Sequence, residues 1–591
     1  MVTIPRPEHP QPQMRRERWT NLNGEWSFYI DYGDSGKDRK LYQKKEFSEK
    51  IIVPFCPESS LSGVGHVDFM PAVWYQKKLM FKKELDGGRV LLHFGAVDYR
   101  CSVWINGKQV GEHCGGYSSF AFDVTDFLAE GENSLVVYAQ DDVRCGLQPR
   151  GKQSPGYFSK GCNYTRVTGI WQTVWLEYVP ENYICSVQYY PDVADHTLTV
   201  KAQVRGTGVL EAKASYEGRE CGSAQARSMG RTVMVTVPLT ETHLWEPGHG
   251  RLYDLELRFG EDCVESYFGM REIRIDGEKV LINGKPVFQR LVLDQGYYPD
   301  GIYTAPSEEA LERDIRISLE AGYNGARLHQ KIFEPRYLYC CDRLGYLVWE
   351  EHGCWGLDYS RPEALAAFLP EWMETLERDF NHPAIIGWCP FNETWDYEGR
   401  KQEESLLKVV YQATKLFDST RPCIDTSGSY HVVTDIYDLH DYEQNPELLA
   451  EHYASFKAGG ELRDTHPERQ TPVKGIPVFV SEYGGIRWDT GSAQERDWGY
   501  GETPKTKEEF LERYRRLTDV FLDNPRMFGF CYTQLYDVEQ EVNGLYTYAR
   551  EAKFDMAVFR EINGRKAAIE EDEWEGDPLF REVSAQGKSM L

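Results

Sequence analysis

From residue 276 onward the chain alternates short apolar runs with amphipathic helical stretches, and this alternation restricts the fold more than any other feature. One helical stretch repeats apolar residues every four positions, at Leu311, Ile315 and Leu319. Eight apolar runs between such stretches resemble buried strands, at residues 287–288, 324–327, 346–350, 385–388, 423–425, 435–438, 478–481 and 528–531. Eight strands separated by helices over residues 276–591 predict a (β/α)8 barrel, also called a TIM barrel.

Two β-rich regions precede this segment. Residues 1–180 contain short strand-like runs, one of which ends in Asn106-Gly107, a strong hairpin signal. We therefore expect a jelly-roll β-sandwich of the sugar-binding kind here. In residues 181–275 apolar and polar positions alternate, as at Leu198, Val200 and Ala202, which predicts a smaller immunoglobulin-like sandwich.

The bulk composition excludes several classes of function. With 591 residues and a formal net charge of −26, the chain lacks the basic surface that nucleic acids or anionic membranes require. No apolar run reaches the roughly 18 residues of a membrane-spanning helix. The polar N-terminus lacks the apolar core of a signal peptide, and the 14 cysteines form no C-x-x-C pair, so we expect a cytoplasmic protein. No cofactor or metal motif is present in the sequence, so none is expected.

Two glutamates end apolar runs in the barrel segment. Glu393 closes the stretch Ile-Ile-Gly-Trp-Cys-Pro-Phe-Asn-Glu, and Glu482 closes Pro-Val-Phe-Val-Ser-Glu. They follow the fourth and seventh predicted strands, and barrel enzymes carry their sites at these strand ends. Cleavage of a glycosidic bond needs two carboxylates facing one sugar, one as proton donor and one as nucleophile or base. The pair therefore predicts a glycosidase.

The chain resembles glycoside hydrolase family 2, the family of β-galactosidases and β-glucuronidases, over nearly its whole length. Three segments carry the resemblance, at residues 169–177, 381–393 and 477–484, and the order of the three domains matches as well. The resemblance implies a retaining double displacement, with Glu482 as nucleophile and Glu393 as acid/base. In such enzymes the two carboxyl groups lie about 5–5.5 Å apart.

The resemblance also implies roles for neighbouring residues. Asn392 would bind the sugar 2-hydroxyl, Tyr442 would hydrogen-bond the nucleophile, and Arg327 would lie beneath it and keep it ionised. His440 could contact substrate or be an ordinary surface histidine. Asp294, after the first strand, is a candidate for binding a sugar hydroxyl. Family resemblance alone favours a homo-oligomer.

Three departures from the family pattern concern the identity of the sugar. The usual histidine after the second strand is replaced by Gln330, unless His329 takes its place. Tyr532 stands where the family often has a tryptophan against the sugar. The stretch 541–545 lacks the lysine with which glucuronidases hold the substrate carboxylate, and a buried uronate without a cation would be poorly compensated.

We therefore expect a β-galactosidase-like exo-glycosidase acting on a neutral sugar. A β-glucuronidase is the alternative and would need a cation elsewhere in the pocket. Arabinosidases and galactofuranosidases also stay open. An alternative of another class is a carbohydrate-binding protein without catalytic activity, although such a protein would have no need of both glutamates.

Overall fold

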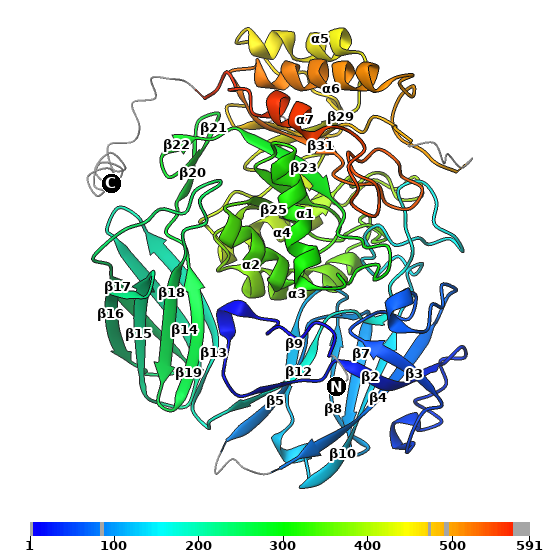
Figure 1. The fold of residues 1–591 in the computed structure, drawn as a ribbon, viewed down its shortest axis with the longest axis vertical. Coiled ribbons are helices and arrows are strands. Elements are labelled where there is room, and N and C mark those ends of the chain that lie inside the picture. Colours follow the sequence, from blue (N-terminus) through cyan, green and yellow to red (C-terminus); the bar gives the residue numbers. More distant parts are fainter. Residues whose placement is uncertain (1–3, 83–87, 471–473, 490–495, 571–591) are drawn as a thin grey trace.

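The computed structural model describes residues 4–82, 88–470, 474–489 and 496–570. Two β-sandwiches lie side by side beneath a larger body of strands and helices (Figure 1). The N-terminal sandwich is blue to cyan, the second sandwich is teal to green, and the larger body runs from green to red. No helix in the described ranges combines the length and apolar character needed to cross a membrane.

The N-terminal sandwich has the predicted jelly-roll character. The predicted Asn106-Gly107 turn joins β7 (Arg100–Ile105) to β8 (Lys108–Cys114), and the two residues adopt positive φ angles of 53° and 75°, as this kind of tight hairpin requires. One of its two main sheets has the strand order β1 (Trp19–Asn21), β12 (Val174–Val179), β5 (Arg89–Phe94), β9 (Phe120–Asp123). The other has the order β3 (Glu49–Val53), β2 (Gly24–Ile30), β4 (Ala72–Phe81), β10 (Gly131–Gln140), β7 (Arg100–Ile105), β8 (Lys108–Cys114). A short pair, β6 (Val97–Asp98) and β11 (Gly169–Ile170), adjoins them.

The second sandwich is immunoglobulin-like. The alternating residues Leu198, Val200 and Ala202 of β14 (Thr197–Arg205) are fully buried between the two sheets of this domain, as their period of two predicts. One sheet has the strand order β13 (Tyr183–Asp192), β14 (Thr197–Arg205), β17 (Thr232–Pro238). The other has the order β16 (Arg219–Arg227), β15 (Val209–Tyr216), β18 (Tyr253–Phe259), β19 (Asp262–Phe268). A small sheet of β20 (Ile273–Asp276), β21 (Lys279–Ile282) and β22 (Lys285–Pro286) leads into the third domain.

The third domain is the predicted TIM barrel. Seven parallel strands follow the order β26 (Ile385–Cys389), β25 (Leu347–Glu351), β24 (Gly325–Leu328), β23 (Gln289–Asp294), β31 (Met527–Thr533), β30 (Val478–Gly484), β29 (Tyr437–Asp441). The gap between β26 and β29 is filled by the short parallel pair β27 (Phe391–Asn392) and β28 (Thr426–Ser427). The helices are α1 (Glu308–Glu320), α2 (Pro335–Leu344), α3 (Glu363–Asp379), α4 (Glu404–Phe417), α5 (Pro446–Lys457), α6 (Lys507–Leu522) and α7 (Met556–Asn563).

Three details of the barrel differ from the sequence prediction. The first strand begins at Gln289, so the predicted run 287–288 lies just before it. The fifth strand is reduced to Thr426–Ser427, with a parallel bridge between Trp388 and Cys423 beside it. Glu482 lies inside β30 rather than after it, because the strand continues to Gly484.

A jelly-roll loop between β10 and β11 packs onto the barrel at its strand ends. The amide of Arg150 donates to the carbonyl of Trp355 at 2.7 Å, and that of Gly151 donates to the carbonyl of Gly353 at 2.9 Å. A Cβ at Gly151 would lie only 2.2 Å from the carbonyl oxygen of Gln330, so the two backbones touch. The N-terminal domain therefore forms part of the surroundings of the barrel mouth.

Candidate active site

Glu482 is held by hydrogen bonds at both of its carboxylate oxygens. One carboxylate oxygen accepts a hydrogen bond from Arg327 Nη1 at 2.7 Å, and the other accepts one from the Tyr442 hydroxyl at 2.5 Å. Tyr442 also lies 3.1 Å from Thr533 Oγ1 and stacks on the ring of Tyr500 with centroids 3.6 Å apart. Arg327 of β24 and Tyr442, directly after β29, thus fix the carboxylate, and Thr533 of β31 helps to hold Tyr442. The orientation of Glu482 is therefore set before any substrate binds.

Glu393 lies opposite Glu482 and is more accessible. Its side chain is 19% exposed, against 6% for Glu482. It directly follows β27, where its amide donates to the carbonyl of Ser427 at 2.9 Å and its φ is +48°. A positive φ is unfavourable for glutamate, and such strain is characteristic of functional positions.

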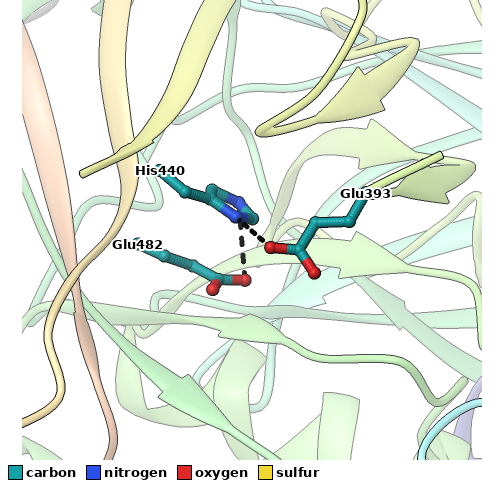
Figure 2. A group of neighbouring side chains, drawn as sticks. All are labelled: Glu393, His440 and Glu482. Carbon is teal, nitrogen blue, oxygen red and sulfur yellow. Dashed lines mark hydrogen bonds and ion pairs between the residues drawn. The ribbon is translucent and has the colours of Figure 1, made fainter. Parts of the chain in front are cut away.

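His440 joins the two acids (Figure 2). Its Nδ1 lies 2.8 Å from Glu393 Oε1, and its Nε2 lies 3.4 Å from Glu482 Oε1. One carboxylate oxygen of each glutamate and one nitrogen of His440 all lie within 4.8 Å of one another. The two acids, 89 residues apart in sequence, therefore face one another across a gap of a few ångströms.

Arg327 connects the nucleophile candidate to a second buried carboxylate. Its Nη2 hydrogen-bonds Glu351 and, at 2.6 Å, the side-chain oxygen of Asn392. The guanidinium therefore lies beneath Glu482 and beside the amide expected to contact the sugar. Because Arg327 is 1% exposed, its charge is little screened by water.

The charges of the site keep Glu482 ionised. Burial alone would raise the pKa of this carboxyl, but nearby charges, above all those of His440 and Arg327, outweigh that effect and lower the pKa to about 2. For His440, burial opposes the charged form, yet Glu482 and Glu393 raise the pKa of the imidazole above its ordinary value. The site thus pairs a permanent carboxylate with an imidazole biased towards the protonated form.

The two residues after the second strand, His329 and Gln330, point to different places. His329 Nδ1 lies 2.9 Å from Glu351 and 3.9 Å from Glu482, so His329 faces the acids. Gln330 is fully buried: it accepts from the amide of Trp355 at 3.1 Å and approaches Cys354 Sγ at 3.5 Å. His329, rather than Gln330, occupies the position beside the site.

Two residues that the sequence predicts to contact the sugar, Asp294 and Tyr532, lie away from this cluster. Asp294 is fully buried, and its carboxylate accepts from Tyr536 at 2.5 Å, Tyr337 at 2.9 Å and the amide of Gly296 at 2.9 Å, so its observed partners are all protein groups inside the barrel. Tyr532 packs its ring against Tyr483 and against Tyr514 of α6. It therefore faces the outer helix layer and not the barrel mouth, because side chains alternate across a strand.

Several residues of the site were not found from the sequence. Glu351 is the last residue of β25, and in the sequence it closes an apolar run as Glu393 and Glu482 do, so the pattern did contain this signal. Lys152 and Tyr164 belong to the jelly-roll loop, and no barrel periodicity points to them. Tyr164 hydrogen-bonds Glu541, and Lys152 places its ammonium 4.5 Å from the ring centroid of Trp355. The indole N–H of Trp355 donates to the carbonyl of Asn392 at 3.2 Å, so Lys152 lies at the site itself.

A barrel that holds two close carboxylates at its strand ends, one kept ionised and one partly exposed, is the site of a glycoside hydrolase. Glu393, His440 and Glu482 could also surround a metal ion, since their donor atoms lie within 4.8 Å. Any ion there would occupy both acids at once. The arrangement of the site alone thus favours acid–base chemistry on a sugar.

Comparison with known proteins gives the family. The chain belongs to glycosyl hydrolases family 2: the family's sugar binding domain matches residues 19–180, its central domain matches residues 182–271 and its TIM barrel domain matches residues 273–565. The sequence is 27% identical to a β-glucuronidase of Sus scrofa over 88% of this chain and 84% of that protein. It is 26% identical to a β-galactosidase of Thermoanaerobacter pseudethanolicus over 71% of this chain and 58% of that protein.

A solved structure confirms the fold. A β-glucuronidase from an uncultured Clostridium species superimposes with a TM-score of 0.76 and 22% sequence identity, covering 93% of this chain and 99% of the other. The jelly roll, the immunoglobulin-like domain and the barrel are therefore those of a family 2 glycoside hydrolase.

Proposed function

We propose that this protein is a retaining exo-β-glycosidase that hydrolyses terminal β-glucuronides. The observation that carries the choice of sugar is the buried ammonium of Lys152 beside the two acids. The β-galactosidase-like activity expected from the sequence thereby becomes the second candidate. The relatives named β-glucuronidase support this order.

The geometry supports a double displacement. Glu482 Oε attacks the anomeric carbon while the bond to the leaving oxygen breaks and Glu393 gives that oxygen its proton. Glu393 then takes a proton from water, the water oxygen attacks the same carbon, and Glu482 is released as carboxylate. Carboxylate oxygens within 4.8 Å of each other agree with the short spacing of retaining enzymes and leave little room for the extra water of inverting ones.

Lys152 supplies the cation that the stretch 541–545 lacks. The residue is 6% exposed, and its ammonium lies over Trp355 at 4.5 Å. It forms no ion pair with any residue in the described ranges. Burial opposes its charge, but Cys162, Glu541, Glu482 and Glu393 together raise the pKa of Lys152, so it stays protonated. A substrate carboxylate would give this ammonium a direct partner and limit the cost of burying both charges.

A substrate screen with two lysine variants tests this proposal. We expect kcat/KM for 4-nitrophenyl β-D-glucuronide to exceed that for the β-D-galactoside by at least about 10-fold. Lys152→Met should lower the glucuronide value by roughly 10²-fold, the effect of truncating one partner of a buried charge pair, and leave the galactoside value nearly unchanged. Lys160→Met, an exposed lysine of the same loop, is the control. A preference for the galactoside, or an equal loss on both substrates, would reject the uronide assignment.

One observation favours a neutral sugar as the second candidate. Glu541 is 2% exposed, lies near Lys152 and Glu482, and is held by Tyr164 and by Asn543 at 3.0 Å. A carboxylate here could accept hydrogen bonds from sugar hydroxyls, and it would repel a uronate. Glu541→Gln separates the two cases: it should raise glucuronide hydrolysis if a uronate binds nearby and lower galactoside hydrolysis if hydroxyls bind instead.

A further inference from the structure

Trp395 lies two residues beyond Glu393 and is the most exposed tryptophan in the described part of the chain, at 39%. Thr394, between them, is fully buried, and its hydroxyl contacts Thr426 at 3.0 Å and Ser429 at 3.1 Å. The amide of Trp395 donates back to the carbonyl of Glu393 at 2.7 Å. With Thr394 turned inward, the chain turns tightly, and the side chains of Glu393 and Trp395 on either side of it are accessible.

Two further rings hold the indole in place. Tyr430 packs edge-to-face on Trp395 with centroids 5.4 Å apart, and His466 does so at 5.6 Å. Tyr430 and His466 also meet edge-to-face at 5.0 Å. These three rings come from the loops that follow β27, β28 and α5, so three separate barrel segments meet here. Edge-to-face packing is the favourable arrangement for aromatic pairs, and it orders the indole.

An arginine fastens the cluster. The guanidinium of Arg469 lies 4.0 Å from the ring centroid of Tyr430 and pairs with Asp396 at 2.6 Å. It thereby ties the segment after α5 to the loop that carries Trp395. The indole N–H of Trp395 forms no hydrogen bond with any described residue. The indole is thus exposed to solvent, held in place by neighbouring rings and equipped with a free hydrogen-bond donor, which distinguishes it from an isolated apolar side chain on the surface.

Trp395 is two residues from Glu393, and the chemistry of Glu393 indicates what lies on this side of the site. Glu393 gives its proton to the oxygen of the departing group, so that group leaves beside Glu393 and not beside Glu482. We propose that Trp395, supported by Tyr430 and His466, forms a binding site for the leaving group and stacks on its flat ring. The ring is an aromatic aglycone or the apolar face of a sugar; both present a planar surface to the indole.

The proposal rests on the glycosidase reaction but not on which sugar is cleaved. Glycosides of the preferred sugar are compared with three leaving groups: 4-nitrophenol, a monosaccharide and methanol. Trp395→Ala should lower kcat/KM by about 10-fold for a leaving group that stacks and by less than about 3-fold for methanol. Trp395→Phe should retain most of the activity. Tyr32→Ala, an exposed aromatic of the jelly roll, should change none of these values.

Each result has a defined meaning. A loss on the aryl glycoside alone identifies an aromatic aglycone, and a loss on the disaccharide identifies a sugar; either supports the site. An equal loss on the methyl glycoside would mean that Trp395 supports Glu393 instead, and no loss on any substrate would mean a surface side chain; either overturns the proposal. If Trp395→Ala unfolds, the ratio of aryl to methyl activity in Trp395→Phe and Trp395→Leu gives the same decision. Because only ratios within one sugar are compared, failure of the glucuronide assignment leaves this test intact.

Discussion

Gly428 lies directly against the ring of His440: a Cβ at Gly428 would come within 2.3 Å of the imidazole carbons. The glycine also has a φ of +67°, a conformation that other residues adopt reluctantly. The histidine between the two acids can therefore occupy its position only because residue 428 of the neighbouring loop has no side chain.

Gly428→Ala should consequently impair catalysis more than stability. Displacing His440 by about 1 Å would disturb both glutamates, and misplacement on this scale costs up to roughly 10²-fold in kcat. Gly399→Ala is a matched control, because Gly399 has a φ of +79° but no atom within 4 Å of its added Cβ. Equal activity of the two variants, measured on an aryl glycoside, would show that the contact with His440 has no catalytic importance.

The two acids should be distinguished by azide. Glu482→Ala and Glu393→Ala should each lower turnover of an aryl β-glycoside by roughly 10³-fold or more. Added azide should rescue Glu482→Ala with an inverted, α-configured glycosyl azide, since azide takes the place of the nucleophile. It should rescue Glu393→Ala with a retained β-azide, since azide then attacks the glycosyl-enzyme. NMR of the products assigns the anomers, and exchanged configurations would reverse the two roles.

Arg327 should determine the acid limb of the pH profile. The pKa of Glu482 is lowered to about 2 against the effect of burial, in part by this guanidinium. Removing the cation in Arg327→Met raises that pKa, so kcat/KM should begin to fall at a higher pH than in the wild type. Arg327→Lys, which keeps the charge, should shift the limb less. The same acid limb in all three proteins would mean that Arg327 does not act on the nucleophile.

His440 should make stability depend on pH in a defined direction. Burial opposes its charge, but Glu482 and Glu393 raise its pKa in the folded protein above the unfolded value. This contribution is fully present below the unfolded pKa of about 6.5 and is lost as pH rises through the folded pKa. The difference in Tm between wild type and His440→Gln should therefore be larger at pH 6 than at pH 9. A difference that grows with pH would contradict the assigned charge.

The jelly-roll loop should be sensitive to its contact with the barrel. A Cβ at Gly151 would lie 2.2 Å from the Gln330 carbonyl, so Gly151→Ala should displace the loop and with it Lys152. We expect kcat/KM to fall by about 10-fold or more, with a larger effect on the glucuronide than on the galactoside. Gly161→Ala is the control in the same loop, with a similar φ of +57° and no atom within 4 Å. Similar kinetics for both variants would show that the position of this loop does not affect catalysis.

The architecture could be predicted from sequence because periodicity records which face of each element is buried. The period of two at Leu198 and Val200 and the spacing of four at Leu311 and Ile315 appear in the structure as buried faces. The fifth strand was harder, because Thr426–Ser427 is too short to carry a period. The first strand was placed two residues early for a related reason, since Val287 and Phe288 are apolar but precede the ladder.

The candidate site was predictable only where a strand end marked it. Glu393, Glu482 and Arg327 all follow or end apolar runs, and the structure brings them together. Asp294 also ends a strand, yet its carboxylate turns to Tyr337 and Tyr536, which no strand pattern could reveal. Tyr532 lies on the face of its strand opposite to the one predicted from the sequence, because its ring packs against Tyr483 and Tyr514.

Lys152 and Trp395 belong to loops, where sequence order says little about spatial neighbours. Lys152 is separated from Glu541 by almost four hundred positions and reaches the site only because two domains dock. Trp395 was visible next to Glu393, but its ring partners Tyr430 and His466 come from other loops. Contacts of this kind between distant loops arise from the three-dimensional fold and leave no local pattern in the sequence.

The docking of the jelly-roll loop also bears on how such proteins can diversify. A barrel separated from the N-terminal domain would keep both acids but would lose Lys152 and Tyr164, which the jelly-roll loop contributes. Exchanging the first domain between homologous chains could therefore transplant substrate preference onto an unchanged reaction centre. In a chimera of this kind, chemistry and selectivity would be inherited from different parents.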